Sequence, residues 1–482
     1  MRYLILATVL ICGVVGAADR PNVLFIMADD LRPEIASYGS PALTPNLDRL
    51  AKRSVQFQRA YCQQAVCNPS RSSMLTGRRP DTLRLWNNSI HFRELNPDVT
   101  TLPLWFKEHG YVTRDAGKIF HNWHTQDKGD HRSWSADEFL FYENHGNDKP
   151  QVTGELPPNL ATANKSGAYG ATARTECRDV PDEAYYDGRV AAEAVRVLAE
   201  VKDKPFFLAV GFWKPHAPFN APKKYWDLYD RAKLPTLNPA RPEGAPDIAF
   251  HNSTEILGPL EKQKPLTAEQ IAEMRHGYFA NISYMDAQLG KVLDALEKSG
   301  VADKTIITFV GDHGYHIGEH RQWGKTSNFE YDAHVPFLIS APGVGSPGQT
   351  KSLAELLDLF PTLVDLCGLP KPAGIEGDSL VPVLKNPSAT VKPAAFTQHP
   401  RPAYFDREPD KKPKAMGCSV RTAQVRYTEW RDWTTGAVIA RELYDTESDP
   451  AELRNALDDS NLAAARAEAE KLLLVRFPIV KH

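Results

Sequence analysis

The sequence has few cysteines and almost no net charge. Its 482 residues include six cysteines, and 57 basic against 60 acidic residues give a formal net charge of −3. Cysteines so few and scattered form no disulfide framework, and the balanced charge argues against a general nucleic-acid or membrane-surface binder. No internal repeat or low-complexity tract stands out. These absences leave a globular protein, and its length of 482 residues suggests two or three structural units.

Long apolar runs are also missing, except at the N-terminus. There the apolar run Tyr3–Val15 follows a basic start and precedes the small residues Gly16–Ala18. This layout is typical of a secretory signal peptide, so we expect residues 1–18 to be removed and the mature chain to begin near Asp19. Because no other segment is long and apolar enough to span a bilayer, we expect an exported, soluble protein.

Apolar runs of strand length alternate with longer helix-like segments, which predicts a doubly wound α/β fold. The expected strands are Asn22–Ala28, Tyr111–Ala116, Phe206–Phe212, Thr305–Val310 and Pro336–Ser340. The expected helices are Pro45–Ser54, Asp187–Glu200, Ala268–Ser299 and Leu353–Cys367. Two stretches rich in Pro, Gly, Asn and charge, Asn122–Pro181 and Ala217–Pro265, are expected to be insertions that build a binding surface.

The Pro/Gly-rich segment Leu369–Val383 indicates a domain boundary. Beyond it, strand-like runs at Thr422–Trp430 and Val438–Tyr444 precede a final helix rich in Ala, Glu and Leu. We therefore expect a main domain over residues 19–385 and a smaller α+β C-terminal subdomain over residues 386–482.

Charged and imidazole side chains follow four of the expected strands. They are Asp29-Asp30 after the first strand, Lys118 and His121 after the second, Lys214 and His216 after the third, and Asp312-His313 after the fourth. Loops at the carboxyl ends of strands converge on one edge of an open α/β sheet, where ligands bind. Each group alone is as readily a turn or a cap, but the set of four indicates a functional site.

This set combines hard oxygen ligands with cations. Asp29, Asp30 and Asp312 offer carboxylates beside His313, a group that suits Ca²⁺ or Mg²⁺ better than zinc. The residues that are cationic, or can become so, are Arg71, Lys118, His121, His216 and Lys325. A metal beside a ring of cations favours a substrate with a compact oxyanion, either phosphate or sulfate.

Residues 65–80, AVCNPSRSSMLTGRRP, place a cysteine, an arginine and several hydroxyls at the start of an expected helix. Asn68 suits the N-cap, Pro69 the first helical position and Gly77 the end. Cys67 would then lie at the positive end of the helix, where a sulfur ionises readily and an anion is stabilised. The alternative is a capped helix with a buried, inert cysteine.

The run from Cys67 to Arg71, followed by LTGRRP, resembles the C-x-P-S-R signature of type I sulfatases, whose cysteine a maturation enzyme oxidises to formylglycine. The resemblance extends from PNVLFIMADDLRPEIASYG through GDHGYHIGEHRQWGK to ELYDTESDPAELRNA. GRRPDTLRLW, GKIFH, KPHAPF and GEHRQWGK are similar to segments of iduronate-2-sulfatase-like enzymes. The resemblance implies an alkaline-phosphatase-like mixed sheet sandwiched by helices, with residues 19–385 as the sulfatase catalytic domain.

The resemblance also implies roles for single residues. Ca²⁺, or Mg²⁺ in its place, would be bound by Asp29, Asp30, Asp312, His313 and the modified Cys67. Arg71 and Lys118 would hold the formylglycine hydrate, and His121 would lie beside its second hydroxyl. The residues expected to contact the substrate are His216 and Lys325, at the sulfate and leaving oxygen, with His320 and Tyr315 toward the sugar.

In this family one hydroxyl of the hydrate attacks sulfur, and deprotonation of the second expels sulfate and restores the aldehyde. The implied substrate is a sulfated polysaccharide or glycosaminoglycan oligosaccharide. The enzyme would act at the chain end, on a 2-O-sulfated uronic acid or a related sugar. Two alternatives stay open. One is a phosphomonoester or phosphonate hydrolase of the same superfamily, and the other is a non-catalytic binder of sulfated glycans with an unmodified Cys67.

Overall fold

The computed structural model describes residues 20–121, 125, 127–139, 175–258 and 260–479. The expected signal peptide and most of the first expected insertion lie outside these residues. Within the described ranges, no helix is long and apolar enough to cross a membrane.

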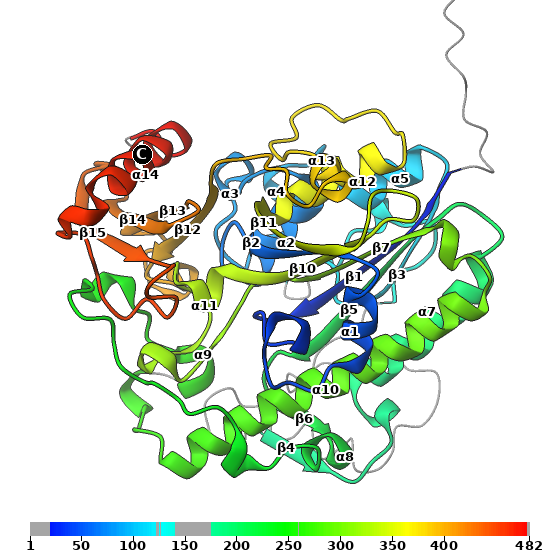
Figure 1. Ribbon diagram of the computed structural model, residues 1–482, viewed down its shortest axis with the longest axis horizontal. Coiled ribbons are helices and arrows are strands. Elements are labelled where there is room, and N and C mark those ends of the chain that lie inside the picture. The colour runs from blue at the N-terminus through cyan, green and yellow to red at the C-terminus, as the bar shows by residue number, and fades with distance from the viewer. Residues whose placement is uncertain (1–19, 122–124, 126, 140–174, 259, 480–482) are drawn as a thin grey trace, which may run out of the picture.

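A seven-stranded sheet forms the centre of the molecule (Figure 1). Its spatial order is β11-β2-β10-β7-β1-β5-β3, and β10 runs antiparallel to both neighbours while the other pairs are parallel. The strands are β1 (Asn22–Asp29), β2 (Val55–Tyr61), β3 (Val112–Gly117), β5 (Phe206–Pro215), β7 (Thr305–Gly311), β10 (His334–Ser340) and β11 (Gly348–Glu355).

Helices cover both faces of this sheet (Figure 1). One face carries α1 (Pro45–Ala51), α7 (Tyr186–Val201) and α10 (Ala268–Lys298), and the other carries α2 (Cys67–Thr76), α5 (Leu102–Glu108), α12 (Leu359–Leu366) and α13 (Val381–Lys385). Successive side chains of β1 enter the two cores in turn, Leu24 and Ile26 on one side and Phe25 and Met27 on the other. This alternation explains why β1 reads as one continuous apolar run.

Shorter elements connect and extend these layers. The short helices are α3 (Pro80–Leu83), α4 (Phe92–Leu95), α8 (Lys223–Trp226), α9 (Thr254–Leu257) and α11 (Glu330–Ala333). Two small sheets pair β4 (Thr175–Arg178) with β6 (Phe219–Pro222), and β8 (His316–Ile317) with β9 (Trp323–Gly324).

A second sheet lies at one side of the molecule with the C-terminal helix packed on it (Figure 1). It is antiparallel and consists of β12 (Ala395–Arg401), β13 (Ala415–Arg421), β14 (Val425–Asp432) and β15 (Val438–Asp445), followed by α14 (Ala463–Arg476). The expected α/β fold with a mixed sheet between helices, and with a smaller α+β unit after it, is confirmed.

Two local expectations are wrong. Leu353–Cys367 was expected to be one helix, but Leu353 and Ala354 pair with β2 as part of β11, and the α-helix begins only at Leu359. Pairing with a neighbouring strand outweighs local helix propensity there. The other correction concerns α2, which begins at Cys67 after an extended N-cap, Val66, instead of at Pro69.

Candidate active site

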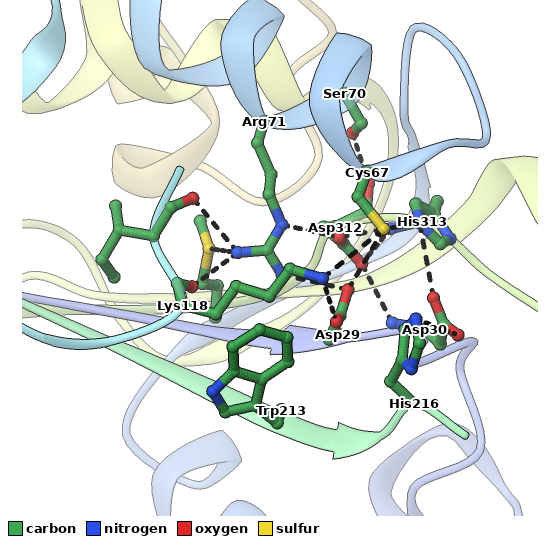
Figure 2. Close-up of polar contacts among 12 residues, drawn as sticks. Asp29, Asp30, Cys67, Ser70, Arg71, Lys118, Trp213, His216, Asp312 and His313 are labelled. Carbon is green, nitrogen blue, oxygen red and sulfur yellow. Dashed lines mark hydrogen bonds and ion pairs between the residues drawn. The ribbon is translucent and has the colours of Figure 1, made fainter. Parts of the chain in front are cut away.

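The polar residues that follow the central strands meet above one edge of the sheet (Figure 2). β7, β1, β5 and β3 are consecutive parallel neighbours, so their carboxyl ends lie side by side. Asp29 is the last residue of β1, and Asp30 has a φ of 60°, a left-handed conformation that turns the chain away from the strand. Lys118, His216 and Asp312 directly follow β3, β5 and β7.

Cys67 faces this edge from the first turn of α2 and is fully buried (Figure 2). Its Sγ lies 3.5 Å from Asp29 Oδ1, 3.3 Å from His313 Nε2 and 3.7 Å from Lys118 Nζ. Burial, with the Asp29 carboxylate nearby, raises the pKa of the thiol well above its usual value. The expectation that this sulfur ionises readily is therefore wrong, because desolvation and Asp29 outweigh the favourable charges of Lys118 and Lys325.

Asn68 has a different task from the capping that we expected. Its side-chain amide donates to the carbonyl oxygens of Asn87 and Ile90, at 3.0 and 2.8 Å. These bonds tie the first turn of α2 to the loop that follows α3. The helix ends as expected at Gly77, whose φ is 64°.

Arg71 and Lys118 hold the carboxylates beneath Cys67. Arg71, fully buried, donates from Nε to Asp312 Oδ2 at 2.8 Å and from Nη2 to Asp29 Oδ1 at 3.2 Å. The Lys118 ammonium lies 2.5 Å from Asp29 Oδ2 and 4.7 Å from the centre of the Trp213 ring. Burial alone would raise the pKa of Asp29, but Lys118 and Arg71 hold it well below its usual range.

Asp30 and His313 complete the acidic side of the site. Burial raises the pKa of Asp30 well above its usual value, and Asp29 and Glu255 add to this although Lys325 opposes it. The His313 Nδ1–H donates to the Gly314 carbonyl at 3.0 Å, and burial lowers the pKa of the imidazole. The neutral ring therefore directs the Nε2 lone pair toward the carboxylates.

These residues fit a hard divalent cation. The ligand atoms of Asp29, Cys67, Asp312 and His313 lie within 4.8 Å of one another, and those of Asp29, Asp30, Cys67 and His216 form a second, overlapping group. Burial is the main cause of the raised pKa of Asp30, and repulsion from Asp29, Glu255 and Asp312 adds to it. A cation between these carboxylates would relieve that repulsion. Oxygen ligands with one imidazole match Ca²⁺ or Mg²⁺.

His216 and Lys325 both lie next to Asp30. The His216 Nδ1–H donates to the Ala217 carbonyl at 2.5 Å, so Nε2 faces Asp30 Oδ2 at 3.8 Å. The Lys325 ammonium lies 2.9 Å from Asp30 Oδ1 and 2.8 Å from Glu255 Oε1. Lys214 has a structural role, because its ammonium donates to the His216 and Pro218 carbonyls.

Sequence reasoning missed two residues of this site. Glu255 comes from α9, inside the second expected insertion, and Tyr404 comes from the C-terminal unit. The Tyr404 hydroxyl donates to Glu255 Oε2 at 2.7 Å, while Glu255 Oε1 lies 3.5 Å from His216 Nε2. Neither residue belongs to a recognisable motif, so only the fold brings them to the site.

The remaining predicted residues fall in different places. His121 is buried just past the end of β3. Tyr315 is fully buried, and its ring centre lies 5.8 Å from the Lys325 ammonium. His320 is also fully buried, with Nε2 bonded to the Ala451 carbonyl at 2.8 Å. Neither Tyr315 nor His320 exposes surface in this structure, and their contact with the sugar stays a prediction.

Comparisons with known proteins agree with this geometry. The family model described as "Sulfatase" matches residues 21–369, and the model described as "N-sulphoglucosamine sulphohydrolase, C-terminal" matches residues 318–476. The chain belongs to the sulfatase family. It is a sulfuric ester hydrolase, as its similarity to iduronate 2-sulfatases also indicates.

Iduronate 2-sulfatases are among the relatives of this sulfatase. It is 36% identical to the enzyme of Mus musculus and 35% identical to that of Homo sapiens, in each case over 92% of both chains. This confirms the expected likeness to iduronate-2-sulfatase-like enzymes.

Solved structures share the whole fold of this sulfatase. A phosphonate monoester hydrolase of Agrobacterium radiobacter has a TM-score of 0.75 and 27% identity over 95% of both chains. A structure described as a 2-O GAG sulfatase has a TM-score of 0.66 and 22% identity, over 95% of this chain and 92% of its own. The alkaline-phosphatase-like architecture expected from the sequence is thereby confirmed.

Proposed function

We propose that this sulfatase is exported and removes sulfate esters from the ends of sulfated sugar chains, using a formylglycine made from Cys67. The observation that carries the proposal is the position of Cys67 Sγ, within 3.7 Å of Asp29, His313 and Lys118. A nucleophile at this point faces metal-ligating carboxylates on one side and fixed cations on the other. Such an arrangement stabilises the charge that develops during attack on a sulfate ester.

The buried thiol itself is a poor nucleophile, because its pKa is raised well above the usual value. A formylglycine hydrate at the same position has two hydroxyls in its place. Arg71 and Lys118 would hold the hydrate, with Asp29 kept ionised between them. Asp29, Asp30, Asp312, His313 and residue 67 would hold Ca²⁺, or Mg²⁺ in its place, which lowers the pKa of the attacking hydroxyl.

The leaving side of the reaction belongs to His216 and Lys325. Both lie next to Asp30 and open toward Glu255, the more exposed side of the cluster. We assign His216 as the group that protonates the leaving alcohol and Lys325 as a contact to the sulfate. His121 would accept the proton of the second hydroxyl and so release sulfate from residue 67.

The proposed substrate is a sulfated polysaccharide or glycosaminoglycan oligosaccharide with a terminal 2-O-sulfated uronic acid or a related sugar. The iduronate 2-sulfatases of mouse and human support this choice by name, and so does the structure described as a 2-O GAG sulfatase. The apolar N-terminal run supports export, and the signature around Cys67 supports a formylglycine-generating maturation enzyme as a partner.

Intact mass and sulfate release test the proposal together. Conversion of Cys67 to formylglycine lowers the mass by one sulfur and two hydrogens less one oxygen. We expect this species in the native protein, and sulfate release from defined 2-O-sulfated oligosaccharides that is abolished in Cys67→Ala. An unmodified cysteine with tight glycan binding would favour a non-catalytic binder, and Cys67→Ala with wild-type turnover would refute the nucleophile.

A further inference from the structure

Glu255 places a fourth carboxylate at the active site, on its more exposed side. Its side chain is 12% exposed, whereas those of Asp29, Asp30 and Asp312 are fully buried. It lies 2.8 Å from the Lys325 ammonium, which already has Asp30 as a partner at 2.9 Å. Lys325 therefore lies between two carboxylates, those of Asp30 and Glu255.

The fixed charges of the site are otherwise balanced. When a bound metal ion keeps Asp30 ionised, the cations Arg71, Lys118 and Lys325 balance the carboxylates of Asp29, Asp30 and Asp312. A protonated His216, 3.5 Å from Glu255, adds one positive charge. A divalent ion held by the carboxylates then leaves a charge of +3 without Glu255 and +2 with it. A sulfate monoester carries one negative charge, whereas a phosphate monoester carries about two above its second pKa of about 6.

We propose that Glu255 makes this sulfatase select singly charged sulfate monoesters over doubly charged phosphate monoesters. This proposal rests on the proposed function. It names a residue that would determine selectivity for sulfate over phosphate, on a fold that a phosphonate monoester hydrolase also has. Like charges a few ångströms apart in a mostly buried site repel strongly. A doubly charged phosphate ester is therefore repelled about twice as strongly as a singly charged sulfate ester in the same position.

Two contacts hold Glu255 ionised and in place. Burial would raise the pKa of Glu255, but Lys325 and the Tyr404 hydroxyl outweigh it and lower the pKa. Tyr404 itself is fixed by the Arg407 guanidinium, 4.2 Å from its ring centre. Because Tyr404 belongs to the C-terminal unit, that unit positions the charge that discriminates between substrates.

The test compares esters with the same leaving group. We would measure kcat/KM for 4-nitrophenyl sulfate and 4-nitrophenyl phosphate at about pH 8, where the phosphate ester is a dianion. Glu255→Gln should lower the sulfate-to-phosphate ratio by about 10- to 100-fold, chiefly through a lower KM for phosphate. Glu255→Asp keeps the charge and should keep the wild-type ratio. Tyr404→Phe removes the hydrogen bond that positions Glu255, so it should shift the ratio in the same direction as Glu255→Gln, by less.

An equilibrium measurement makes the test independent of turnover. In the Cys67→Ala background with metal supplied, calorimetry would compare the binding of phenyl sulfate and phenyl phosphate with and without Glu255→Gln. The substitution should improve phosphate binding more than sulfate binding. Unchanged ratios in binding and turnover would overturn the proposal. If the wild-type enzyme cleaves neither aryl ester, the binding ratio decides the part of Glu255, and the proposed function is decided separately by sulfate release from the 2-O-sulfated oligosaccharides.

Discussion

Asp312 connects the fixed cations to the rest of the acidic cluster. Its Oδ1 accepts from the backbone N–H groups of Asp30 and His313, and its Oδ2 accepts from Arg71. Asp312→Asn keeps the shape but removes one charge from the metal ligands, so Ca²⁺ should bind more weakly and activity should fall with it. Thermal unfolding with and without chelator checks this, since chelation should lower the Tm of the wild type more than that of the variant.

The identity of the bound ion is tested in the same experiment by comparing Zn²⁺ with Ca²⁺ and Mg²⁺. Zinc at full occupancy, with no response of activity or Tm to Ca²⁺ or Mg²⁺, would contradict the assignment of a hard cation.

The two histidines at the site should act at different steps. His121→Ala should release about one equivalent of desulfated product and then stall with one sulfo group on residue 67, because the second proton cannot be removed. His216→Ala should slow the first cleavage, most severely for alcohols of high pKa. Rapid-quench kinetics with intact mass checks both. A sulfated enzyme that accumulates in His216→Ala and not in His121→Ala would reverse the roles.

Asp115, buried in β3, should make stability depend on pH. Burial raises its pKa to about 7, against about 3.9 in an unfolded chain. The folded protein holds this proton more tightly, so the stabilisation is complete below about pH 4 and is lost as pH rises toward about 7. Asp115→Asn cannot ionise, and its Tm relative to wild type should rise by about 2 °C or more between about pH 5 and about pH 8. A pH-independent difference would refute the shift.

At the scale of elements, the end of α2 is set by Gly77. Its φ of +64° is left-handed, and an added Cβ would lie 2.7 Å from Ile375 Cδ1. Gly77→Ala should therefore lower the free energy of unfolding by about 2 kcal/mol from strain and overlap together. Gly300→Ala is the matched control, because Gly300 has a φ of +78° with nothing within 4 Å of the new Cβ. Urea unfolding should show a clearly smaller loss for the control.

The elements that could be predicted from the sequence are those with an unambiguous local signal. β1, β5 and β7 are fully buried and read as apolar runs, and α10 begins with a capping box between Thr267 and Gln270. β2 and β11 were missed because their pairing depends on partners far away in the chain.

The site divides in the same way. Asp29 and Asp312 follow predicted strands directly, so the topology of the sheet predicts that they lie close together. Glu255 and Tyr404 meet through a contact 149 residues apart in sequence, which no local pattern encodes. The full burial of His320 likewise depends on Ala451 in the C-terminal unit.

At the scale of the whole molecule, a buried ionic network joins the main sheet to the C-terminal unit. Glu330, in α11, accepts from Arg421 Nε at 2.7 Å and from Arg426 Nη2 at 2.8 Å. Both arginines belong to the C-terminal sheet, and Glu452 receives Arg426 Nε at 2.9 Å. Burial would raise the pKa of Glu330, but the arginines lower it below its usual range.

Breaking this network should cost much more than breaking a surface pair. Glu330→Gln leaves two buried guanidinium groups short of a partner, and the free energy of unfolding should fall by about 3 kcal/mol. Asp294→Asn, which breaks a pair exposed by 40% and 49%, should change it little. Because the lowered pKa of Glu330 stabilises the fold above its ordinary pKa, the difference from wild type should shrink as pH falls below about 4. Thermal unfolding at neutral and acidic pH checks both.

The burial of Cys67 also limits when this residue can be modified. With no part of this side chain exposed in the folded protein, a maturation enzyme can reach it only while the chain is still open, so folding and modification compete for the same molecule. A host that folds the chain faster than it modifies it would accumulate a stable but permanently inactive product. Exposing purified, unmodified protein to the maturation enzyme should therefore convert nothing until a denaturant opens the fold, and conversion of the native protein would show that α2 opens by itself.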